Sequence, residues 1–367
     1  MEEDTLEILG KAGLRLVWFD SLGAKSSCIS IARCGCKIII DPGAAAMQPS
    51  YPLPGSEKAR LRAKALEAIE RECLDANYVI VTHYHYDHHV LPSDPTLRDP
   101  LGMWVRGKKL ILKDPNKYIN ESQWFRARKF LSQLLGMVGL SLEDYLTSPL
   151  ESDFEDPVEK LGEALSRDYG DYQKRRMELL EKGRRWFRKL VEKLWSSEKW
   201  VREPRVKGLI DVSWGDNTSF EAGCVRVRIL EPWFHGVEYD RTGWVTPVYI
   251  EAGGYRIFYT SDLMGPAIED YSSYIARLKP HIIVVDGPPT YLFPYMLNRI
   301  NLERTINNLV YIMESCSPKL IIYDHHLLRE KRWRFRVKRV FREASRLGVP
   351  VLTAAECIGL KPLIDKL

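Results

Sequence analysis

Short apolar runs bounded by turn residues dominate the first eighty residues. Residues 14–20, 28–32, 37–41 and 78–82 are each enriched in β-branched side chains, which is typical of buried strands. Residues 56–74 are instead dense in Ala, Leu, Glu, Lys and Arg, which favour a helix. The pattern predicts four strands and one helix before residue 83.

The middle of the chain has a different pattern. From about residue 116 to 204 there is no β-rich run, and Leu, Glu, Lys and Arg predominate. Residues 122–135, 157–167 and 172–195 are predicted helices, the last with one basic face. We interpret this zone as a helical insertion.

Strand patterns return after residue 205. The predicted strands are 225–232, 244–251, 256–262, 281–287 and 319–326, and the predicted helices are 302–315 and 330–347. Strand runs followed by alternating strands and helices indicate two sheets flanked by helices.

Composition limits the class of protein. The 367 residues, 45% hydrophobic and 28% charged, suffice for one large domain with an insertion or for two domains. No run reaches the roughly 18 apolar residues of a membrane helix, and the acidic start MEEDTLEILG lacks the features of a secretory signal. We expect a cytoplasmic protein without a membrane partner. The net charge of +5 permits a nucleic-acid partner without requiring one.

The cysteines do not suggest a disulfide framework. There are seven, an odd number, and no CxxC pair occurs. Cys34-Gly35-Cys36 is expected at a hairpin turn between two strands.

Candidate chemistry begins directly after the fourth predicted strand. Four of the eight histidines lie within residues 82–89, and imidazole and carboxylate groups are the ligands that zinc accepts. The spacing allows His83 and His85 to hold one ion while Asp87 and His88 hold another. A solvated histidine-rich loop is the alternative, but this run follows a buried-type strand in mid-chain.

Other potential ligands also follow predicted strands. His235 lies just past 225–232, Asp262 ends 256–262, and His325 and His326 end 319–326. Any one of these alone is more typical of a cap or of a satisfied polar group. Together with the first cluster they indicate one composite metal site.

These residues resemble a known family. THYHYDHH matches the HxHxDH signature of the metallo-β-lactamase superfamily, and Asp41 in IIIDPG resembles its first motif. His235 is similar to the third-motif histidine, Asp262 to the bridging carboxylate and His325 to the last ligand. The sequence also resembles a branch of this superfamily known chiefly from archaea, for which no substrate is assigned. The resemblance lies in the segments SLG, IDPG, THYHYDHH, FHG, YTSD, VDGPPTY and DHHLL.

The resemblance implies an α/β fold, a four-layer αββα sandwich of two mixed β-sheets. Residues 1–115 and 205–367 would form the catalytic domain. Residues 116–204 would be the helical insertion, serving as a cap over the site or as an interface in a homo-oligomer.

The resemblance also implies a site with two divalent ions, expected to be Zn²⁺ with Mn²⁺ or Fe²⁺ as alternatives. The implied ligands are His83, His85 and His235 for the first ion, Asp87, His88 and His325 for the second, and Asp262 as the bridge. A hydroxide shared by the ions would attack a carbonyl or phosphorus centre. Asp87, Asp262 and Asp41 are the implied catalytic carboxylates.

Some assignments stay open at this point. His325 is favoured over His326 because it directly follows the strand-end residue Asp324. His89 lies outside HxHxDH, and His281 precedes its strand, so neither is assigned to the site. Candidates to orient ligating histidines through the second ring nitrogen are Asp41, Asp324 and Asp286. No leaving-group acid is evident.

Three functions are compatible with this sequence. The first is a hydrolase of a small phosphodiester or ester-type molecule. The second is a nuclease acting on RNA or DNA, with the basic helix 172–195 and Trp186, Trp195 and Trp200 as its surface. The third is a non-catalytic metal-binding protein, which the intact and open ligand set disfavours.

Overall fold

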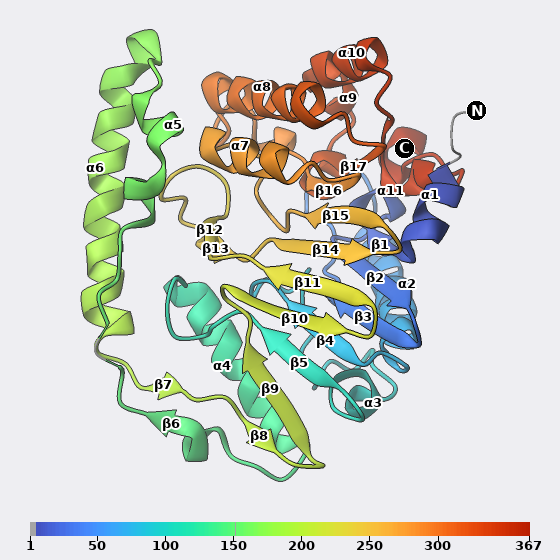
Figure 1. The fold of residues 1–367 in the computed structure, drawn as a ribbon, viewed down its shortest axis with the longest axis vertical. Coiled ribbons are helices and arrows are strands. Elements are labelled where there is room, and N and C mark those ends of the chain that lie inside the picture. Colours follow the sequence, from blue (N-terminus) through green and yellow to red (C-terminus); the bar gives the residue numbers. More distant parts are fainter. Residues whose placement is uncertain (1–4, 151) are drawn as a thin grey trace.

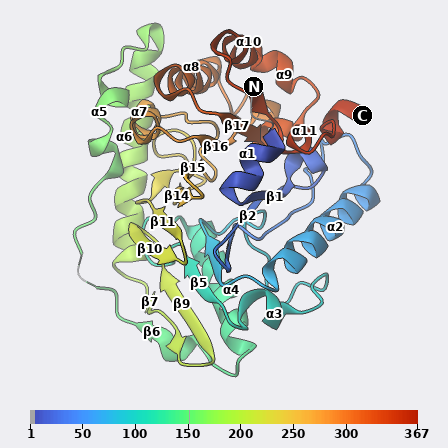
Figure 2. The ribbon, with the colours of Figure 1, turned by 45° about the vertical axis from the view of Figure 1, so that its right-hand side comes forward.

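Two seven-stranded mixed sheets stack face to face in the computed structural model, which describes residues 5–150 and 152–367 (Figures 1 and 2). The order in the first sheet is β1-β2-β3-β4-β5-β9-β8. Its strands are β1 (Leu14–Phe19), β2 (Ser27–Arg33), β3 (Cys36–Ile40), β4 (Tyr78–Val81), β5 (Lys109–Leu112), β8 (Arg205–Val206) and β9 (Ile210–Trp214).

The second sheet has the order β10-β11-β14-β15-β16-β17-β18. Its strands are β10 (Thr218–Ala222), β11 (Val225–Ile229), β14 (Val248–Ala252), β15 (Tyr255–Tyr259), β16 (Ile282–Asp286), β17 (Leu320–Asp324) and β18 (Val351–Leu352). Two short pairs, β12 (Trp233–Phe234) with β13 (Trp244–Val245) and β6 (Leu146–Thr147) with β7 (Trp200–Val201), stand apart from the large sheets.

Helices cover the outer faces of both sheets (Figure 1). The larger ones are α2 (Gly55–Cys73) and α4 (Glu121–Gly136) on the first sheet, and α7 (Glu269–Leu278), α8 (Arg299–Cys316) and α10 (Lys338–Leu347) on the second. Shorter helices are α1 (Thr5–Ala12), α3 (Pro100–Trp104), α9 (Trp333–Arg336) and α11 (Ala354–Cys357). The layers are therefore α, β, β and α, the expected sandwich. Among the described residues, no helix is long and apolar enough to cross a membrane.

Strand side chains alternate between two hydrophobic layers. Ile38, Ile40 and Ile80 point between the sheets, whereas Ile39 and Val79 point toward the helices. All five are at most 1% exposed. Continuous apolar runs without polar alternation follow from this burial on both faces.

The predicted insertion contains more than helices. It includes α4, α5 (Gly162–Ser166), α6 (Gln173–Leu190) and the strands β6 and β7. In Figure 1, α5 and α6 stand beside the sandwich, next to the β12–β13 pair. The division of the chain into a catalytic domain and a 116–204 insertion stays a prediction.

Several predicted boundaries are wrong for local reasons. The predicted strand 244–251 is split into β13 and β14 around Pro247, which has no N–H for a ladder. The predicted helix 157–167 is a 3₁₀ turn, Pro157–Lys160, followed by α5, and 330–347 is divided into α9 and α10 at Val337. Strand β5 and helix α7 were not predicted.

Parallel pairing places the chemistry at one edge. Strands β3, β4 and β5 run parallel in the first sheet, and β15, β16 and β17 run parallel in the second. Parallel strands end at the same edge of their sheet, so the residues that follow them are brought together. The amino ends of β3 and β11 lie at the opposite edge.

That opposite edge carries a disulfide, which contradicts the expectation from the cysteine count. Cys34, in the β2–β3 turn, is bonded to Cys224, in the β10–β11 turn, with 5.9 Å between their Cα atoms. Cys34 does lie at a hairpin turn as expected. The bond joins residues 190 positions apart, a separation that sequence spacing could not connect.

Loss of this disulfide is expected to destabilise the fold. Cys34→Ser or Cys224→Ser should lower the free energy of unfolding by about 2–4 kcal/mol, because the cross-link restricts the unfolded chain. Urea unfolding with and without dithiothreitol measures the effect. Cys316→Ser, which removes a thiol free of any disulfide, is the matched control. Equal midpoints for the oxidised and reduced wild type would contradict the bond.

Candidate metal centre

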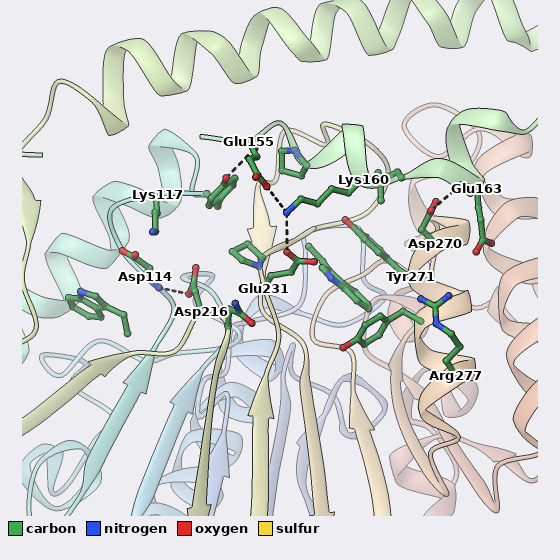
Figure 3. Close-up of a pocket in the computed structure, with 18 residues that line it drawn as sticks. Asp114, Lys117, Glu155, Lys160, Glu163, Asp216, Glu231, Asp270, Tyr271 and Arg277 are labelled. Carbon is green, nitrogen blue, oxygen red and sulfur yellow. Dashed lines mark hydrogen bonds and ion pairs between the residues drawn. The ribbon is translucent and has the colours of Figure 1, made fainter. Parts of the chain in front are cut away.

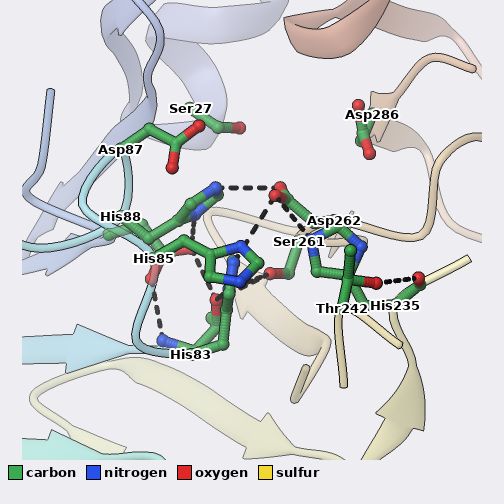
Figure 4. A network of polar contacts seen from close by, with 12 residues as sticks. Ser27, His83, His85, Asp87, His88, His235, Thr242, Ser261, Asp262 and Asp286 are labelled. Atoms are coloured by element: carbon green, nitrogen blue, oxygen red, sulfur yellow. Dashed lines mark hydrogen bonds and ion pairs between the residues drawn. The ribbon is translucent and has the colours of Figure 1, made fainter. Parts of the chain in front are cut away.

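Ends of strands from both sheets deliver the candidate ligands to one point. His83, His85, Asp87 and His88 follow β4, Asp262 follows β15 and His325 follows β17, while His235 follows β12. Figure 4 shows most of them converging on Asp262. The structure thus brings together every side chain that the sequence assigned as a metal ligand.

Asp262 lies at the middle, with one oxygen toward each side. Its Oδ2 is 3.5 Å from His83 Nε2 and 3.2 Å from His235 Nε2. Its Oδ1 is 2.9 Å from His88 Nε2 and 3.3 Å from His325 Nε2. This is the arrangement expected of a carboxylate that bridges two cations.

Two ligand groups flank this carboxylate. The first group is His83, His85 and His235, whose donor atoms lie within 4.8 Å of one another and of Asp262. The second group is Asp87, His88 and His325, which also lie within that distance of one another. These groups divide the residues as the family resemblance implies.

The donor atoms of the centre fit a divalent cation. Within residues 5–150 and 152–367, His83 Nε2, His235 Nε2 and Asp262 Oδ2 are buried without a hydrogen-bond partner, whereas Asp262 Oδ1 lies 2.9 Å from His88 Nε2. Leaving such groups unsatisfied costs about 1–3 kcal/mol each. Imidazole nitrogens and carboxylate oxygens that need a partner suit zinc, manganese or iron.

Backbone strain is concentrated at the same place. Asp41, Ser261 and His325 each follow a strand and have positive φ angles of 54°, 54° and 60°. Non-glycine residues in this region cost on the order of 1–3 kcal/mol each. Gly43 allows the loop after Asp41 to pack closely against the backbone of the HxHxDH segment, since a Cβ at residue 43 would lie 2.2 Å from His89 N. The local sequence IDPG is therefore compatible with the backbone conformation that directs Asp41 toward the site.

Asp41 connects the loop to both sheets. Its carboxylate accepts bonds from Thr82 N at 2.8 Å and Tyr259 OH at 2.7 Å, and it lies 2.8 Å from His88 Nδ1. The carboxylate is fully buried. It orients the His88 ring so that Nε2 faces Asp262.

Sequence reasoning missed Asp20 and Arg329. Asp20 Oδ1 is 2.8 Å from His325 Nδ1, and Asp20 Oδ2 accepts a 2.6 Å bond from Arg329 Nε. Arg329 Nη2 also lies 3.3 Å from Asp87 Oδ2. The ion pair links two members of the second group. The only sequence signal was the SLG segment that follows Asp20.

Asp286 and Asp324, the two other carboxylates expected to orient a ligating histidine, have different roles. Asp286 is 2.9 Å from His326 Nδ1, and so orients a histidine outside the ligand set. Asp324 accepts backbone N–H groups of Ser21, His325 and Ala354, at 2.7–3.0 Å. Asp324 therefore holds backbone and no ligand ring.

His325 lies nearer to Asp262 than His326 does, but the donor atoms of both lie within 4.8 Å of that carboxylate, so the choice of His325 as the ligand stays a prediction. His326 Nε2 is 4.0 Å from Asp262 Oδ2, compared with 3.3 Å from His325 Nε2 to Oδ1. His89 instead packs edge-on against Phe130, and His281 accepts the N–H of Arg256 at the opposite edge.

The two groups differ in protonation when no cation is bound. Burial, with His88, lowers the pKa of His83 to about 4, and burial with His83 holds the pKa of His85 well below its usual value. Burial also opposes charge on His88, but Asp262 and Asp41 raise its pKa to about 10. Asp20 and Asp262 likewise outweigh burial and raise the pKa of His325 well above its usual range.

A separate cavity of about 520 Å³ lies between the predicted insertion and the ends of β5, β9 and β11 (Figure 3). None of the candidate ligands lines it. Some of its polar groups contact one another: Lys160 Nζ is 2.7 Å from Glu155 and 3.7 Å from Glu231, and Asp270 accepts the N–H of Glu163. Groups able to hold a metal, among the described residues, all lie at the Asp262 centre.

Comparison with known proteins agrees with this geometry. Residues 23–89, which contain Asp41 and the HxHxDH segment, match the family model of the metallo-beta-lactamase superfamily. The stacked mixed sheets and the histidine–aspartate site are those of this class. Over these residues the chain is therefore similar to the metallo-β-lactamase superfamily.

The chain is also similar to curated proteins of archaea. It is 29% identical over 355 residues to a UPF0282 protein of Aeropyrum pernix, covering 95% of this chain and 94% of that protein. It is 28% identical over 345 residues to a UPF0282 protein of Korarchaeum cryptofilum, covering 94% and 88%.

Solved structures are more distant. The metallo-beta-lactamase fold protein YhfI of Bacillus subtilis aligns over 90% of this chain and 88% of its own, at 9% identity and a TM-score of 0.40. The diiron β-hydroxylase CmlA of Streptomyces venezuelae aligns over 90% of this chain and 51% of its own, at 11% identity and a TM-score of 0.41.

Cation binding to the two groups is expected to differ in its dependence on pH. His83 and His85, whose pKa values are lowered, should bind a cation at pH 7 with almost no proton release, whereas His88 and His325 must each lose a proton. Lowering the pH below about 10 should therefore weaken binding to the second group more steeply. Zinc titration calorimetry in two buffers of different ionisation enthalpy measures the released protons. Equal proton release in both binding steps would contradict the assignment.

Proposed function

We propose that the protein is a metal-dependent hydrolase that cleaves a phosphodiester or ester-type bond of a small molecule. The first group and Asp262 would hold one divalent ion, and the second group and Asp262 the other. Zinc is the expected metal, with manganese or iron as alternatives. Cations bound there would supply an activated water and stabilise negative charge on the attacked oxygen.

One observation supports this proposal above all others. Asp262 is buried and turns one oxygen toward each ligand group. A structural zinc site would be closed by four ligands around one ion. A carboxylate shared by two groups instead favours a dinuclear site, the arrangement used for hydrolytic displacement.

His326 is the residue best placed to act on substrate. Its Nδ1 is held by Asp286, and its side chain is 9% exposed, unlike the fully enclosed His83 and His88. Burial, Arg329 and His325 hold the pKa of His326 well below its usual value. A neutral ring held at Nδ1 leaves Nε2 available to accept or pass a proton beside the first group.

Hydrolysis of bis-p-nitrophenyl phosphate tests the function. Metal-loaded wild type should contain about two ions per chain and release p-nitrophenol. His83→Ala and Asp262→Ala should each lower kcat/KM by roughly 1,000-fold or more, because loss of metal-ion stabilisation is worth several kcal/mol. His281→Ala, at the opposite edge, should match wild type. Full metal loading without turnover of phosphodiester or carboxylic ester substrates would refute the hydrolase.

Substitution of the two adjacent histidines should separate their roles. His325→Ala is expected to lose one ion, because it removes a member of the second group. His326→Ala is expected to retain both ions and to lose roughly 100-fold or more in kcat, the usual contribution of a positioned proton-transfer group. Metal analysis and steady-state kinetics measure both. Loss of an ion from His326→Ala with full loading of His325→Ala would reverse the assignment.

A nuclease is the second candidate, supported by the exposed basic face of α6. The exposed cations there are Lys174, Arg175, Lys182, Arg185, Arg188 and Lys189. The prediction that Trp186, Trp195 and Trp200 contribute to a nucleic-acid surface is wrong. These side chains are at most 7% exposed and cannot stack on bases. RNA and DNA belong in the same assay, and failure to bind either at low salt would remove this candidate.

A further inference from the structure

The loop that carries His235 is held from outside by helix α4. The loop spans residues 235–243 between β12 and β13. Asn120 Nδ2 donates to Arg241 O at 2.7 Å, and Gln123 Nε2 donates to Thr242 O at 2.7 Å. Both side chains come from the first turn of α4, where Asn120 also caps the helix by accepting Gln123 N–H.

Thr242 in turn contacts the backbone of the ligand residue His235. Thr242 Oγ1 lies 2.8 Å from His235 O, a contact drawn in Figure 4, and 2.6 Å from Asp240 Oδ1, so its single proton is shared between these two acceptors. His235 N in turn donates to Gly243 O at 3.0 Å. A displacement of the 241–243 backbone would therefore move His235 relative to Asp262.

The other end of Gln123 contacts the HxHxDH segment. Its Oε1 accepts the N–H of Tyr84 at 3.4 Å, and Tyr84 lies between the ligands His83 and His85. Gln123 is fully buried. One amide side chain thus connects the two segments that supply all three residues of the first group.

The loop is shaped to admit this amide. Gly243 has a φ of 102°, and a Cβ at this position would lie 2.9 Å from Gln123 Nε2 and 3.3 Å from Asn120 Cγ. A glycine at this point removes both the backbone strain and the steric conflict. The glycine is an observation independent of the hydrogen bonds, and it favours the same close approach of α4.

The second group has different supports. His88 is held by Asp41 and His325 by Asp20, and neither carboxylate contacts Gln123. Loss of Gln123 should therefore affect the two halves of the centre unequally.

We propose that Gln123 is a positioning residue for the first metal ion, fixing the His83–His85 segment and the His235 loop at the spacing that one cation requires. The inference rests on the proposed dinuclear site. It makes the first helix of the predicted insertion a structural part of the metal centre. Outer-shell partners of this kind typically change metal affinity about 10–100-fold when removed.

Gln123→Met tests the proposal, because methionine keeps the side-chain length and removes both hydrogen-bonding atoms. Zinc affinity is measured by chelator competition and compared with His235→Ala, which removes a first-group ligand, and His325→Ala, which removes a second-group ligand. Gln123→Met should lower the affinity for one of the two zinc ions by about 10–100-fold. This should be the same ion whose binding His235→Ala weakens. The matched control is Gln133→Met, on the same helix, whose Oε1 accepts only Ser93 N–H; it should bind as wild type.

Other outcomes are decisive as well. Unchanged affinity in Gln123→Met, equal weakening of both ions, or the pattern of His325→Ala would each overturn the proposal. If Gln123→Met does not fold, Gly243→Ala keeps Gln123 and displaces its amide; normal binding of both ions by a folded Gly243→Ala would then overturn it. Two zinc ions without hydrolysis in wild type would refute the hydrolase and leave this inference intact.

Discussion

Burial of polar ligands without polar partners is the constraint around which the centre is organised. Four histidine–aspartate contacts cross the interior at one edge of the sandwich, where these side chains are buried. Burying an imidazole or a carboxylate without a partner is unfavourable. A divalent cation on each side of Asp262 would remove that cost, which couples metal binding to the stability of this edge. The strained φ angles at Asp41, Ser261 and His325 add to what the bound ions must offset.

Much of the architecture was predictable because strand patterns are local. The runs that became β1, β2, β3, β4, β16 and β17 are mostly apolar, and each was predicted within two residues; the run that became β15 was predicted to end three residues too late. Strand β5 was not predicted because its apolar part is only the three residues 110–112, which lie between lysines. The split at Pro247 and the break at Val337 depend on single residues, which a pattern averaged over a window does not register.

The site was predictable to the extent that a motif spans contiguous residues or follows a strand. HxHxDH, Asp262 and His325 meet these conditions, and the structure brings them together. Asp20, Arg329 and Gln123 do not, because each contacts a ligand only after distant segments fold together. Asp20 lies 305 residues from His325, and Gln123 lies 39 residues from Tyr84. The pairing of Cys34 with Cys224 is hidden for the same reason.

The two edges of the sandwich are held together in different ways. At one edge a covalent bond joins the β2–β3 turn to the β10–β11 turn, while at the other edge residues of both sheets meet at the metal centre. Ions can leave and return, but the sulfur bridge stays closed under oxidising conditions. Loosening of the site on metal loss would therefore be limited, because the bridged edge and the apolar layer between the sheets keep the strands aligned. Such a molecule would keep, after loss of any bound metal, the alignment needed to bind it again.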